Sequence, residues 1–372
     1  MKIAVNVRLL KKNKLDGIGW FTFHTLKNII EANPNYEFIF IFDKKFDDEF
    51  IFGSNVKSVI APPVTRHPIL WWIWLNISVP FVLNKHKPDV FFSPDGFVPN
   101  YNKCRIVNVI HDINFVHYPK DMPFFTRIFY NYFFQRFAKK SNKLLTVSQY
   151  SKSDIIKTYN VDPQKINVVY NGSDEIYKPI DFQTKIFIKK KYSKGNDFFV
   201  FVGSLHPRKN LKRLILAFDK FKNLTNSNLN LIIVGAKFFK NSEMFEIYHN
   251  LKYKEDIIFT GRLEKEDLHK VVASCLAMVF VPYFEGFGIP ILEAMNCEVP
   301  IICSNVTSMP EVAADAALYV NPFDIEDIAN AMKKIAYDDN LRNELVEKGR
   351  IQRKKYSWQL TAQRVWSSII EN

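Results

Sequence analysis

The sequence FFVFVGSLHPRKNLKRLILAF, residues 198–218, decides the fold of this chain. It begins with the apolar run Phe198–Val202, which is typical of a buried strand. A polar turn follows, and a helical period of apolar residues then begins at Leu211 and continues through Leu214, Ile215, Phe218 and Phe221. A buried strand, a short turn and an amphipathic helix form the repeating unit of parallel α/β sheets.

Further short apolar runs alternate with helical patterns on both sides of this stretch. The earlier predicted strands are Ile3–Val7, Glu37–Phe42, Val90–Ser93, Arg105–Ile110, Lys143–Val147 and Ile166–Val169. The later ones are Phe198–Val202, Asn230–Val234, Ile257–Phe259, Ala277–Val281 and Pro300–Cys303. Two such series predict two Rossmann-like, doubly wound domains.

The join between the domains is expected within Lys178–Asn196, a segment that carries a lysine run and a glycine. We therefore expect an N-terminal domain at 1–178, a C-terminal domain at 179–355, and a final helix at 356–372 that packs back on the N-terminal domain. Ligands of open parallel sheets bind outside the carboxyl ends of the strands. Two facing sheets would therefore share one ligand cleft.

Composition narrows the class of protein. The 372 residues are 47% hydrophobic and 24% charged, which is typical of a folded chain. The formal charge of +13 indicates an anionic partner, such as nucleic acid, anionic lipid or a phosphorylated small molecule, or only a lysine-rich composition. Four cysteines without a Cys-x-x-Cys pair indicate reduced thiols. The N-terminus is predicted to be a strand and not a signal peptide, and no apolar run is long enough to span a membrane.

Basic residues gather in the turn after Phe198–Val202. Arg208 and Lys209 precede the predicted helix, and Lys212 and Arg213 lie in its first turn. Cations at a helix N-terminus oppose the helix dipole, so the arrangement favours a bound anion such as a diphosphate. A solvated basic surface is the alternative explanation.

A second turn follows the predicted strand Ala277–Val281 and reads EGFGIPILEAM, residues 285–295. Its glycines permit a tight turn, and Pro290 suits the first turn of a helix. Glu285 would then lie in the loop and Glu293 one turn inside the helix. One carboxylate could lie near a reacting sugar while the other accepts hydrogen bonds from a ribose. An acidic residue near a helix N-terminus also has the simpler explanation that it suits the dipole.

Two weaker signals lie in the first half of the chain. Gly17 and Gly19 occupy a turn before a helix expected near Phe21, where backbone N–H groups could approach an anion. The turn lacks a full G-x-G-x-x-G, and a plain tight turn explains it equally. His111 directly follows the strand Arg105–Ile110 and would reach the ligand cleft, or would be a loop histidine without a role.

Taken together, these motifs resemble family 4 of the retaining glycosyltransferases, which adopt the GT-B fold. Glu285 and Glu293 are similar to the paired glutamates of that family, and Gly203–Asn210 is similar to its phosphate-binding turn in bacterial mannosyltransferase-like members. The other matching segments, in chain order, are Gly17–Gly19, Val109–Asp112, Val147–Asp154, Tyr170–Gly172, Ser308–Val312 and Tyr356–Trp358. The resemblance thus extends from the first strand to the last helix.

The resemblance implies a role for each matching residue. Arg208 and Lys209 would bind the donor diphosphate, Glu293 the ribose, and Glu285 and His111 would lie at the transferred sugar. The remaining implied donor contacts come from Gly17 and Gly19 near the phosphates or the acceptor, from Arg262 and Leu263 near the base, and from Gly286, Phe287, Gly288 and Ile289 near sugar and phosphate. One departure is Ser204, because many members have arginine there; Arg208 would supply the guanidinium instead.

The predicted function is retaining transfer of a hexose, with mannose suggested by the form of the turn. The donor would be a nucleotide-diphosphate sugar, and the acceptor a glycan or polyprenyl-linked glycan in cell-surface polysaccharide synthesis. No cofactor or metal is expected, because the sequence contains no Asp-x-Asp signature. The alternatives are a GT-B nucleotide-sugar epimerase, a phosphorylase, or a basic nucleic-acid-binding protein; the last lacks a recognisable nucleic-acid module, so no nucleic-acid partner is expected.

Two aromatic stretches, Ile69–Leu75 and Phe124–Lys140, lie in the expected acceptor domain. The second mixes aromatic and cationic residues in a helical pattern, as interfacial helices do. They predict either core helices or attachment to an anionic membrane surface. The expected location is therefore the cytoplasm, with peripheral attachment to the inner face of the cell membrane as an added expectation.

Overall fold

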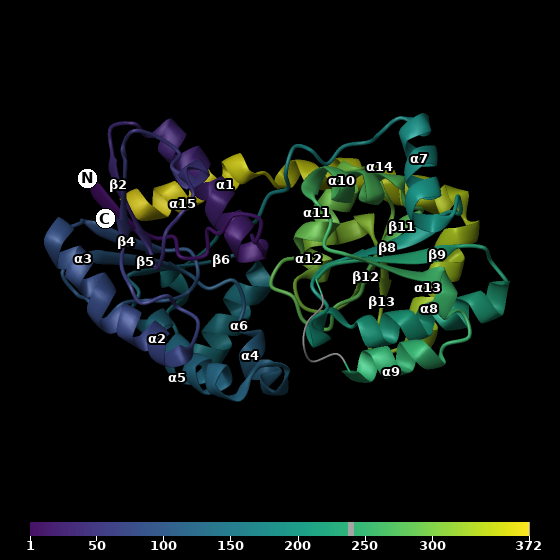
Figure 1. Ribbon diagram of the computed structural model, residues 1–372, viewed down its shortest axis with the longest axis horizontal. Coiled ribbons are helices and arrows are strands. Elements are labelled where there is room, and N and C mark those ends of the chain that lie inside the picture. The colour runs from purple at the N-terminus through teal and green to yellow at the C-terminus, as the bar shows by residue number, and fades with distance from the viewer. Residues whose placement is uncertain (237–241, 372) are drawn as a thin grey trace. The chain divides into compact units, whose positions relative to one another are not determined.

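Two parallel sheets, one in each structural unit, form the frame of the protein (Figure 1). The computed structural model describes residues 1–236 and 242–371. The chain pairs Met1–Gly172 with the segment from Ser357 onward in an N-terminal unit, and Ser173–Tyr356 forms a C-terminal unit. Loops and helices connect the parallel strands within each unit, which is the doubly wound arrangement.

The N-terminal unit has a seven-stranded sheet in the order β3-β2-β1-β4-β5-β6-β7. Its strands are β1 (Lys2–Asn6), β2 (Glu37–Phe42), β3 (Val56–Ile60), β4 (Val90–Ser93), β5 (Arg105–Val109), β6 (Lys143–Thr146) and β7 (Ile166–Val168). Its α-helices are α1 (Gly17–Ala32), α2 (Pro68–Ile73), α3 (Val79–His86), α4 (Asn114–His117), α5 (Phe124–Lys140), α6 (Gln149–Tyr159) and α15 (Trp358–Ile370).

The C-terminal unit has a six-stranded sheet in the order β10-β9-β8-β11-β12-β13. Its strands are β8 (Phe198–Val202), β9 (Asn230–Val234), β10 (Ile257–Gly261), β11 (Ala277–Phe280), β12 (Ile301–Ser304) and β13 (Leu318–Val320). Its α-helices are α7 (Phe182–Ser193), α8 (Leu211–Thr225), α9 (Ser242–Asn250), α10 (Lys265–Ser274), α11 (Ile289–Asn296), α12 (Met309–Ala313), α13 (Ile325–Tyr337) and α14 (Asp339–Gln352).

The prediction of two Rossmann-like, doubly wound sheets is confirmed, with β8 fully buried at the centre of the second. The two strands missed by the sequence patterns, β3 and β13, lie at sheet edges. An edge strand is covered less, so it needs no continuous apolar run. Accordingly, β3 includes Lys57 and Ser58, and β13 has only three residues.

The linker prediction for Lys178–Asn196 is wrong, because most of this segment is the helix α7. The carboxylate of Asp181 caps α7 by accepting the backbone N–H of Thr184 at 2.8 Å. Upstream of the helix, the Tyr177 ring meets the His269 ring edge-on at 6.0 Å. These contacts fix the segment within the C-terminal unit, and the chain divides after Gly172, earlier than the expected boundary at 178.

The last helix, α15, packs against α1 within the N-terminal unit. The Trp358 ring stacks on His24 with ring centroids 5.0 Å apart. A β-carbon on Gly172 would lie 2.2 Å from the Trp358 nitrogen, so only glycine permits this close crossing of the chain. Gly172 and Trp358, which come from two motifs far apart in the sequence, are therefore in direct contact within the N-terminal unit.

The first aromatic stretch is helical but interrupted. Between α2 and α3, residues Trp74–Ser78 form a π-helical turn directly before Pro80. Proline lacks a backbone N–H, so a local shift in the hydrogen-bond register before it is expected. Among the helices of residues 1–236 and 242–371, none is both long enough and apolar enough to cross a bilayer.

Candidate functional site

The predicted phosphate-binding residues lie in the turn after β8, in the C-terminal unit. Pro207–Lys209 form a 3-10 turn, which His206 caps by accepting the backbone N–H of Arg208 on its ring Nδ1 at 3.3 Å. Asn210 then adopts a left-handed conformation and donates from its side chain to the carbonyl oxygens of Val281 at 3.0 Å and Pro322 at 2.6 Å. Asn210 thereby ties the turn to the loops that follow β11 and β13.

Arg208 and Lys209 converge on one carboxylate. The Arg208 Nη1 and the Lys209 Nζ each lie 2.5 Å from Glu285 Oε2, and Arg208 Nη1 also donates to the Phe284 carbonyl at 3.2 Å. The Lys209 and Glu285 side chains are only 9% and 13% exposed. Burial by itself would raise the pKa of the Glu285 carboxyl, but the charges of Arg208 and Lys209 outweigh it and hold the pKa below its usual range.

The loop from Glu285 to α11 is held in place by Ser308 and Met309. The Ser308 hydroxyl donates to the Glu285 carbonyl oxygen at 2.8 Å. Gly288 has a φ of +95°, and a β-carbon there would lie 2.8 Å from the Met309 methyl group. Gly288 therefore meets both a conformational and a steric need for glycine. Pro290 follows in the first turn of α11, as predicted.

Glu293 lies in a separate network from Glu285. It accepts a hydrogen bond from the Tyr177 hydroxyl, and the nearby charges are those of Asp174 and Lys265, which form an ion pair with each other. Burial raises the pKa of Glu293 to about 7, while the Tyr177 hydrogen bond opposes the rise. The two glutamates of the motif thus have pKa values shifted in opposite directions.

The loop after β10 carries the predicted base-binding residues. Gly261 ends β10, and Arg262 and Leu263 follow with the Arg262 side chain exposed. Two residues later, Lys265 begins α10 and pairs with Asp174. This loop is therefore connected to the network that surrounds Glu293. Within the described part of the chain, no cluster of His, Cys, Asp or Glu residues has the makings of a metal site.

His206 is a site residue that the sequence analysis did not single out. Burial, together with the positive charges of Arg208 and Lys209, lowers the pKa of His206 to about 4. The ring is therefore neutral near pH 7. Since its Nδ1 accepts the Arg208 N–H, the ring proton resides on Nε2, which can act as a donor.

In the N-terminal unit, the glycine motif lies inside a helix and not in a turn before it. The helix α1 begins at Gly17 and not near Phe21, because the Asp16 carboxylate caps it by accepting the Gly19 N–H at 3.0 Å. A β-carbon added to Gly17 would meet no other atom within 4 Å. Gly17 and Gly19 thus belong to the first turn of α1, where the Gly19 N–H is already taken by the Asp16 carboxylate.

His111 follows β5, as predicted, and its ring orientation is fixed. Its Nε2 lies 2.8 Å from the Pro94 carbonyl oxygen, and the Phe21 ring of α1 meets it edge-on at 4.9 Å. A carbonyl oxygen only accepts, so Nε2 carries the proton. Burial lowers the pKa of His111 and favours the neutral ring. The other nitrogen, Nδ1, then carries a lone pair and can accept a hydrogen bond.

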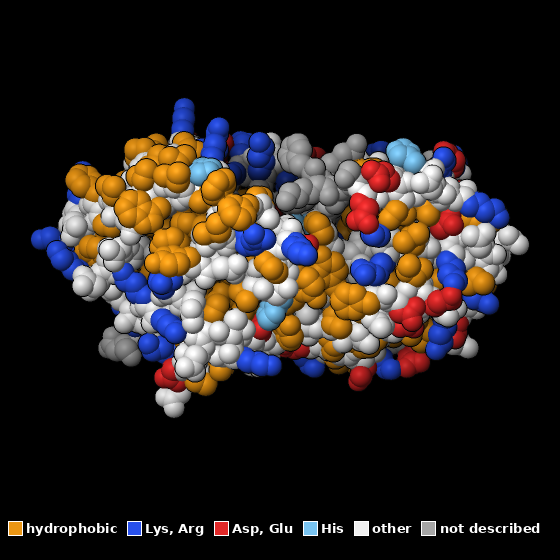
Figure 2. Space-filling model, turned by 90° about the horizontal axis from the view of Figure 1, so that it is seen from below, with side chains coloured by type: hydrophobic (Ala, Val, Ile, Leu, Met, Phe, Trp, Pro, Cys, Tyr) orange, Lys and Arg blue, Asp and Glu red, His pale blue; other side chains and the backbone are white. Residues whose placement is uncertain are grey.

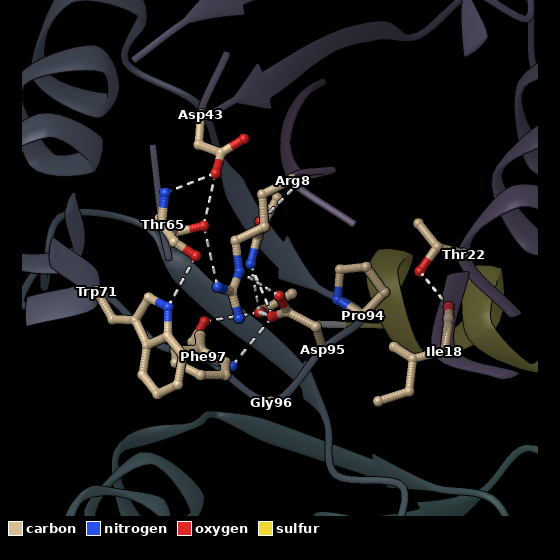
Figure 3. A network of polar contacts seen from close by, with 12 residues as sticks. Arg8, Ile18, Thr22, Asp43, Thr65, Trp71, Pro94, Asp95, Gly96 and Phe97 are labelled. Atoms are coloured by element: carbon tan, nitrogen blue, oxygen red, sulfur yellow. Dashed lines mark hydrogen bonds and ion pairs between the residues drawn. The ribbon is translucent and has the colours of Figure 1, made fainter. Parts of the chain in front are cut away.

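Beside His111, a buried polar network joins the ends of β1, β2 and β4 (Figure 3). Arg8 Nε donates to Asp95 Oδ2 at 2.7 Å, and the guanidinium lies 3.9 Å above the Phe97 ring. The Thr65 hydroxyl accepts from Arg8 at 3.3 Å and donates to Asp43 at 2.6 Å. Pro94 precedes Asp95, so the same network fixes the carbonyl group that orients His111 (Figure 3).

The structure thus assembles Arg208, Lys209 and Glu285 by direct contact. Four further residues were not named by the sequence analysis: His206 in the same turn, Tyr177 on Glu293, and, within the N-terminal unit, the pair Arg8 and Asp95. Arg8 directly follows the predicted strand Ile3–Val7, and Asp95 lies two residues after the predicted strand Val90–Ser93. Their positions at strand ends were therefore a usable signal for them. Tyr177 had no such signal, because its contact with Glu293 joins distant parts of the sequence.

Two family profiles match this chain, one in each half. Glycosyltransferase Family 4 matches residues 17–175, and Glycosyl transferases group 1 matches residues 182–352. The chain belongs to the group 1/family 4 glycosyltransferases. It is accordingly an enzyme of a family that retains the anomeric configuration.

Two curated relatives of this glycosyltransferase are named as O-antigen chain mannosyltransferases. It is 28% identical over 364 residues to O-antigen chain mannosyltransferase B of Escherichia coli, an alignment that covers 94% of each chain. It is 29% identical over 284 residues to O-antigen chain mannosyltransferase RfbU of Salmonella typhimurium, covering 76% of this chain and 74% of the relative.

Solved structures establish the GT-B fold of this glycosyltransferase. WaaG, a glycosyltransferase involved in lipopolysaccharide biosynthesis, has a TM-score of 0.80 at 17% identity, and the superposition covers 100% of both chains. HepE from Anabaena, in complex with UDP and glucose, has a TM-score of 0.77 at 15% identity, again over 100% of both chains. At such low identity the likeness concerns the fold alone.

Proposed function

We propose that this glycosyltransferase moves a hexose, with mannose the leading candidate, from a nucleotide-diphosphate sugar to a glycan or polyprenyl-linked glycan of the cell surface. The mannosyltransferase relatives support the sugar and the O-antigen type of acceptor. The reaction retains the anomeric configuration and uses no metal. The bond between the anomeric carbon and the diphosphate oxygen breaks, and its electron pair leaves on the diphosphate. An acceptor hydroxyl oxygen forms the new bond to the anomeric carbon, and the hydroxyl proton is released to the departing diphosphate.

The observation that carries the proposal is the convergence of Arg208 and Lys209 on a single buried oxygen of Glu285. Two fixed cations at that spacing can instead hold a diphosphate and stabilise the charge that develops as it departs. His206 adds a neutral N–H donor in the same turn. When the cations turn to the diphosphate, Glu285 is released toward the sugar that is being transferred.

The remaining donor contacts follow from the neighbouring loops. Glu293 accepts hydrogen bonds from the ribose hydroxyls, and backbone groups at Arg262 and Leu263 contact the base. Sugar and phosphate are contacted by the backbone of Gly286, Phe287, Gly288 and Ile289. The helix α11 begins in this segment, at Ile289, and the positive end of its dipole favours an anion there.

The N-terminal unit supplies the sugar-directed histidine and the acceptor side of the reaction. His111, neutral and oriented by Pro94, accepts a hydrogen bond from a sugar hydroxyl on Nδ1. Gly17 presents a first-turn amide of α1 to a phosphate or to the acceptor, and Gly19 supports this turn through its N–H donated to Asp16. Glycan hydroxyls and a lipid-linked phosphate both suit such a surface of backbone donors.

A panel of nucleotide sugars tests the proposal. The protein is incubated in excess EDTA with GDP-mannose, UDP-glucose, UDP-galactose and their nucleoside diphosphates, and thermal shift and product anomers are measured. We expect one donor to stabilise the protein and, once a glycan acceptor is added, to be converted with retained configuration. Release of free epimerised sugar without an acceptor would identify an epimerase, and binding to RNA with steep salt dependence but to no donor would identify a nucleic-acid-binding protein.

Donor binding is expected to release a proton below pH 7. In the unbound protein Glu293 titrates at about 7, and ribose hydroxyls hydrogen-bond its ionised form, so binding lowers its pKa. Affinity should therefore be constant above about pH 8 and fall as the pH drops through 7. Calorimetry at pH 6 in two buffers with different ionisation enthalpies should detect the released proton, and at pH 8.5 it should detect almost none.

The control for this linkage is Glu293→Gln, which cannot titrate. It should bind the donor more weakly at every pH and release no proton at pH 6. His206 and Glu285 have pKa values far below this window, so they contribute no comparable signal. Proton release that survives in Glu293→Gln would assign it to another group and remove Glu293 from the ribose.

A further inference from the structure

Two neighbouring helical segments of the N-terminal unit expose large apolar side chains. The segment α2–α3 exposes Ile69, Trp72, Ile77 and Phe81, and α5 exposes Phe124, Phe125, Ile128 and Tyr132. We call these eight residues the aromatic face. Exposed apolar side chains gathered in one region of a surface mark an interaction site more often than singly scattered ones do.

The two segments lie side by side. The Trp71 ring meets the Phe129 ring at 5.3 Å and lies 5.8 Å from that of Tyr130, and the His67 ring lies 6.0 Å from that of Phe125. The expectation of core helices is therefore half correct. The helix α5 buries Phe129 and Phe134 in the unit, and the segment α2–α3 buries Trp74 and Leu83. Each of the two segments also exposes its part of the aromatic face.

The charged residues of the two segments that carry the aromatic face are all positive. Neither Pro68–His86 nor Phe124–Lys140 contains an aspartate or glutamate, whereas α5 contains Arg127, Arg136, Lys139 and Lys140. Along α5 the exposed apolar residues give way to the exposed Arg136 and Lys139. Figure 2 shows this side of the molecule, where hydrophobic side chains of the N-terminal unit lie among lysine and arginine side chains.

Most of the excess positive charge of the protein lies in the N-terminal unit, which also carries the aromatic face. The N-terminal unit contains 24 lysines and arginines against 14 acidic residues, while the C-terminal unit contains 27 against 24. Most of the formal charge of +13 therefore belongs to the unit that carries the aromatic face. The donor diphosphate, proposed to bind in the C-terminal unit, does not account for this asymmetry.

We propose that the aromatic face docks on an anionic lipid bilayer. The apolar side chains enter the boundary between headgroups and acyl chains, Trp72 and Tyr132 lie at headgroup level, and Arg136 and Lys139 contact lipid phosphates. A second copy of the chain fits the face less well, because self-association would bring the cations of two α5 helices together. Docking would hold the N-terminal unit at the surface from which a polyprenyl-linked acceptor is presented.

Vesicle co-sedimentation tests the proposal with matched variants. The double variant Phe81→Ser/Phe125→Ser removes side chains that are 70% and 64% exposed, and its control Phe182→Ser/Phe187→Ser removes two on α7 that are 72% and 62% exposed. We expect the wild type to bind vesicles of phosphatidylcholine with phosphatidylglycerol, and less so as salt rises. The face variant should lose about tenfold or more in partitioning, and the control should bind as the wild type.

Two charge-removing double variants test whether Arg136 and Lys139 contact lipid phosphates. Arg136→Gln/Lys139→Gln should lose the preference for phosphatidylglycerol over phosphatidylcholine alone, whereas the control Lys190→Gln/Lys194→Gln on and beside α7 should keep it. Equal binding to both vesicle types, or an unchanged Phe81→Ser/Phe125→Ser variant, would overturn the proposal. A dimer in solution that this variant converts to monomer would assign the face to a second copy instead.

Failure of membrane docking is distinguishable from failure of the proposed transfer reaction. None of the substituted residues belongs to the donor site, so the thermal shift caused by a nucleoside diphosphate should be the same in all four variants. A face variant that loses vesicle binding but keeps this shift supports docking through the face. One that loses the shift as well is misfolded, and Arg136→Gln/Lys139→Gln then decides the matter.

Discussion

Replacing Lys209 with methionine is expected to lower kcat/KM for sugar transfer by about 100-fold or more, which is the scale of losing one fixed donor to a developing anion. Lys209 is nearly buried, lies 2.5 Å from Glu285 and stands 5.0 Å from the centre of the Phe280 ring. Methionine keeps the apolar stem against Phe280 and removes only the charge. Binding of the nucleoside diphosphate should weaken in parallel, because the same charge holds it before and after the sugar leaves.

The matched control is Lys212→Met, only three residues further along the chain. Lys212 lies in the first turn of α8, is exposed and pairs with Glu243, which is also exposed. Surface pairs of this kind contribute little to stability, so kcat/KM should stay within about twofold of the wild type. Circular dichroism and thermal unfolding confirm that both variants fold. Near-normal transfer by a folded Lys209→Met protein would contradict the assignment of this turn to the diphosphate.

The sequence patterns predicted the sheets well where a strand is central. Five apolar residues in a row, as in β8, can only be buried on both sides, and the prediction for Phe198–Val202 matches the structure residue for residue. Edge strands gave no such signal, since β3 carries a lysine and a serine. The start of α1 was misjudged for a related reason: glycines suggested a turn, but the capping carboxylate of Asp16 outweighs their weak helix propensity.

Sequence patterns likewise predicted some features of the candidate site and missed others. Local motifs predicted Arg208, Lys209, Glu285 and Glu293, and three of these residues meet at one oxygen atom. Local motifs could not predict that Tyr177 donates to Glu293, since more than a hundred residues separate the two in the chain. They also gave no account of which charges surround each glutamate, and this decides that one pKa is lowered while the other is raised.

Glu285→Gln is expected to separate binding from catalysis. In the unbound protein Glu285 occupies both Arg208 and Lys209, so it competes with the diphosphate for the same two cations. Glutamine keeps the shape of the side chain but cannot neutralise them. We therefore expect the nucleoside diphosphate to bind about tenfold more tightly, which corresponds to about 1.4 kcal/mol, while turnover falls by about 100-fold or more.

The Glu285→Gln substitution should also lower the stability of the unbound protein. Without the carboxylate, two partly buried cations face each other, and loss of one partner of a buried ion pair is strongly destabilising. The unbound Glu285→Gln protein should therefore unfold at a lower temperature than the wild type. A bound diphosphate restores the missing negative charge, so the thermal shift it causes should be larger in the variant than in the wild type.

Glu293→Gln is expected to change the affinity for the nucleoside diphosphate in the opposite direction. It removes the acceptor of the ribose hydroxyls and leaves the Arg208 and Lys209 cluster intact, so it should weaken binding of the nucleoside diphosphate. Calorimetric titration of both variants with the same nucleotide compares the two directly. If Glu285→Gln also weakened binding, the carboxylate would be supporting the nucleotide and not competing with it, and the two cations could no longer be assigned to the departing diphosphate.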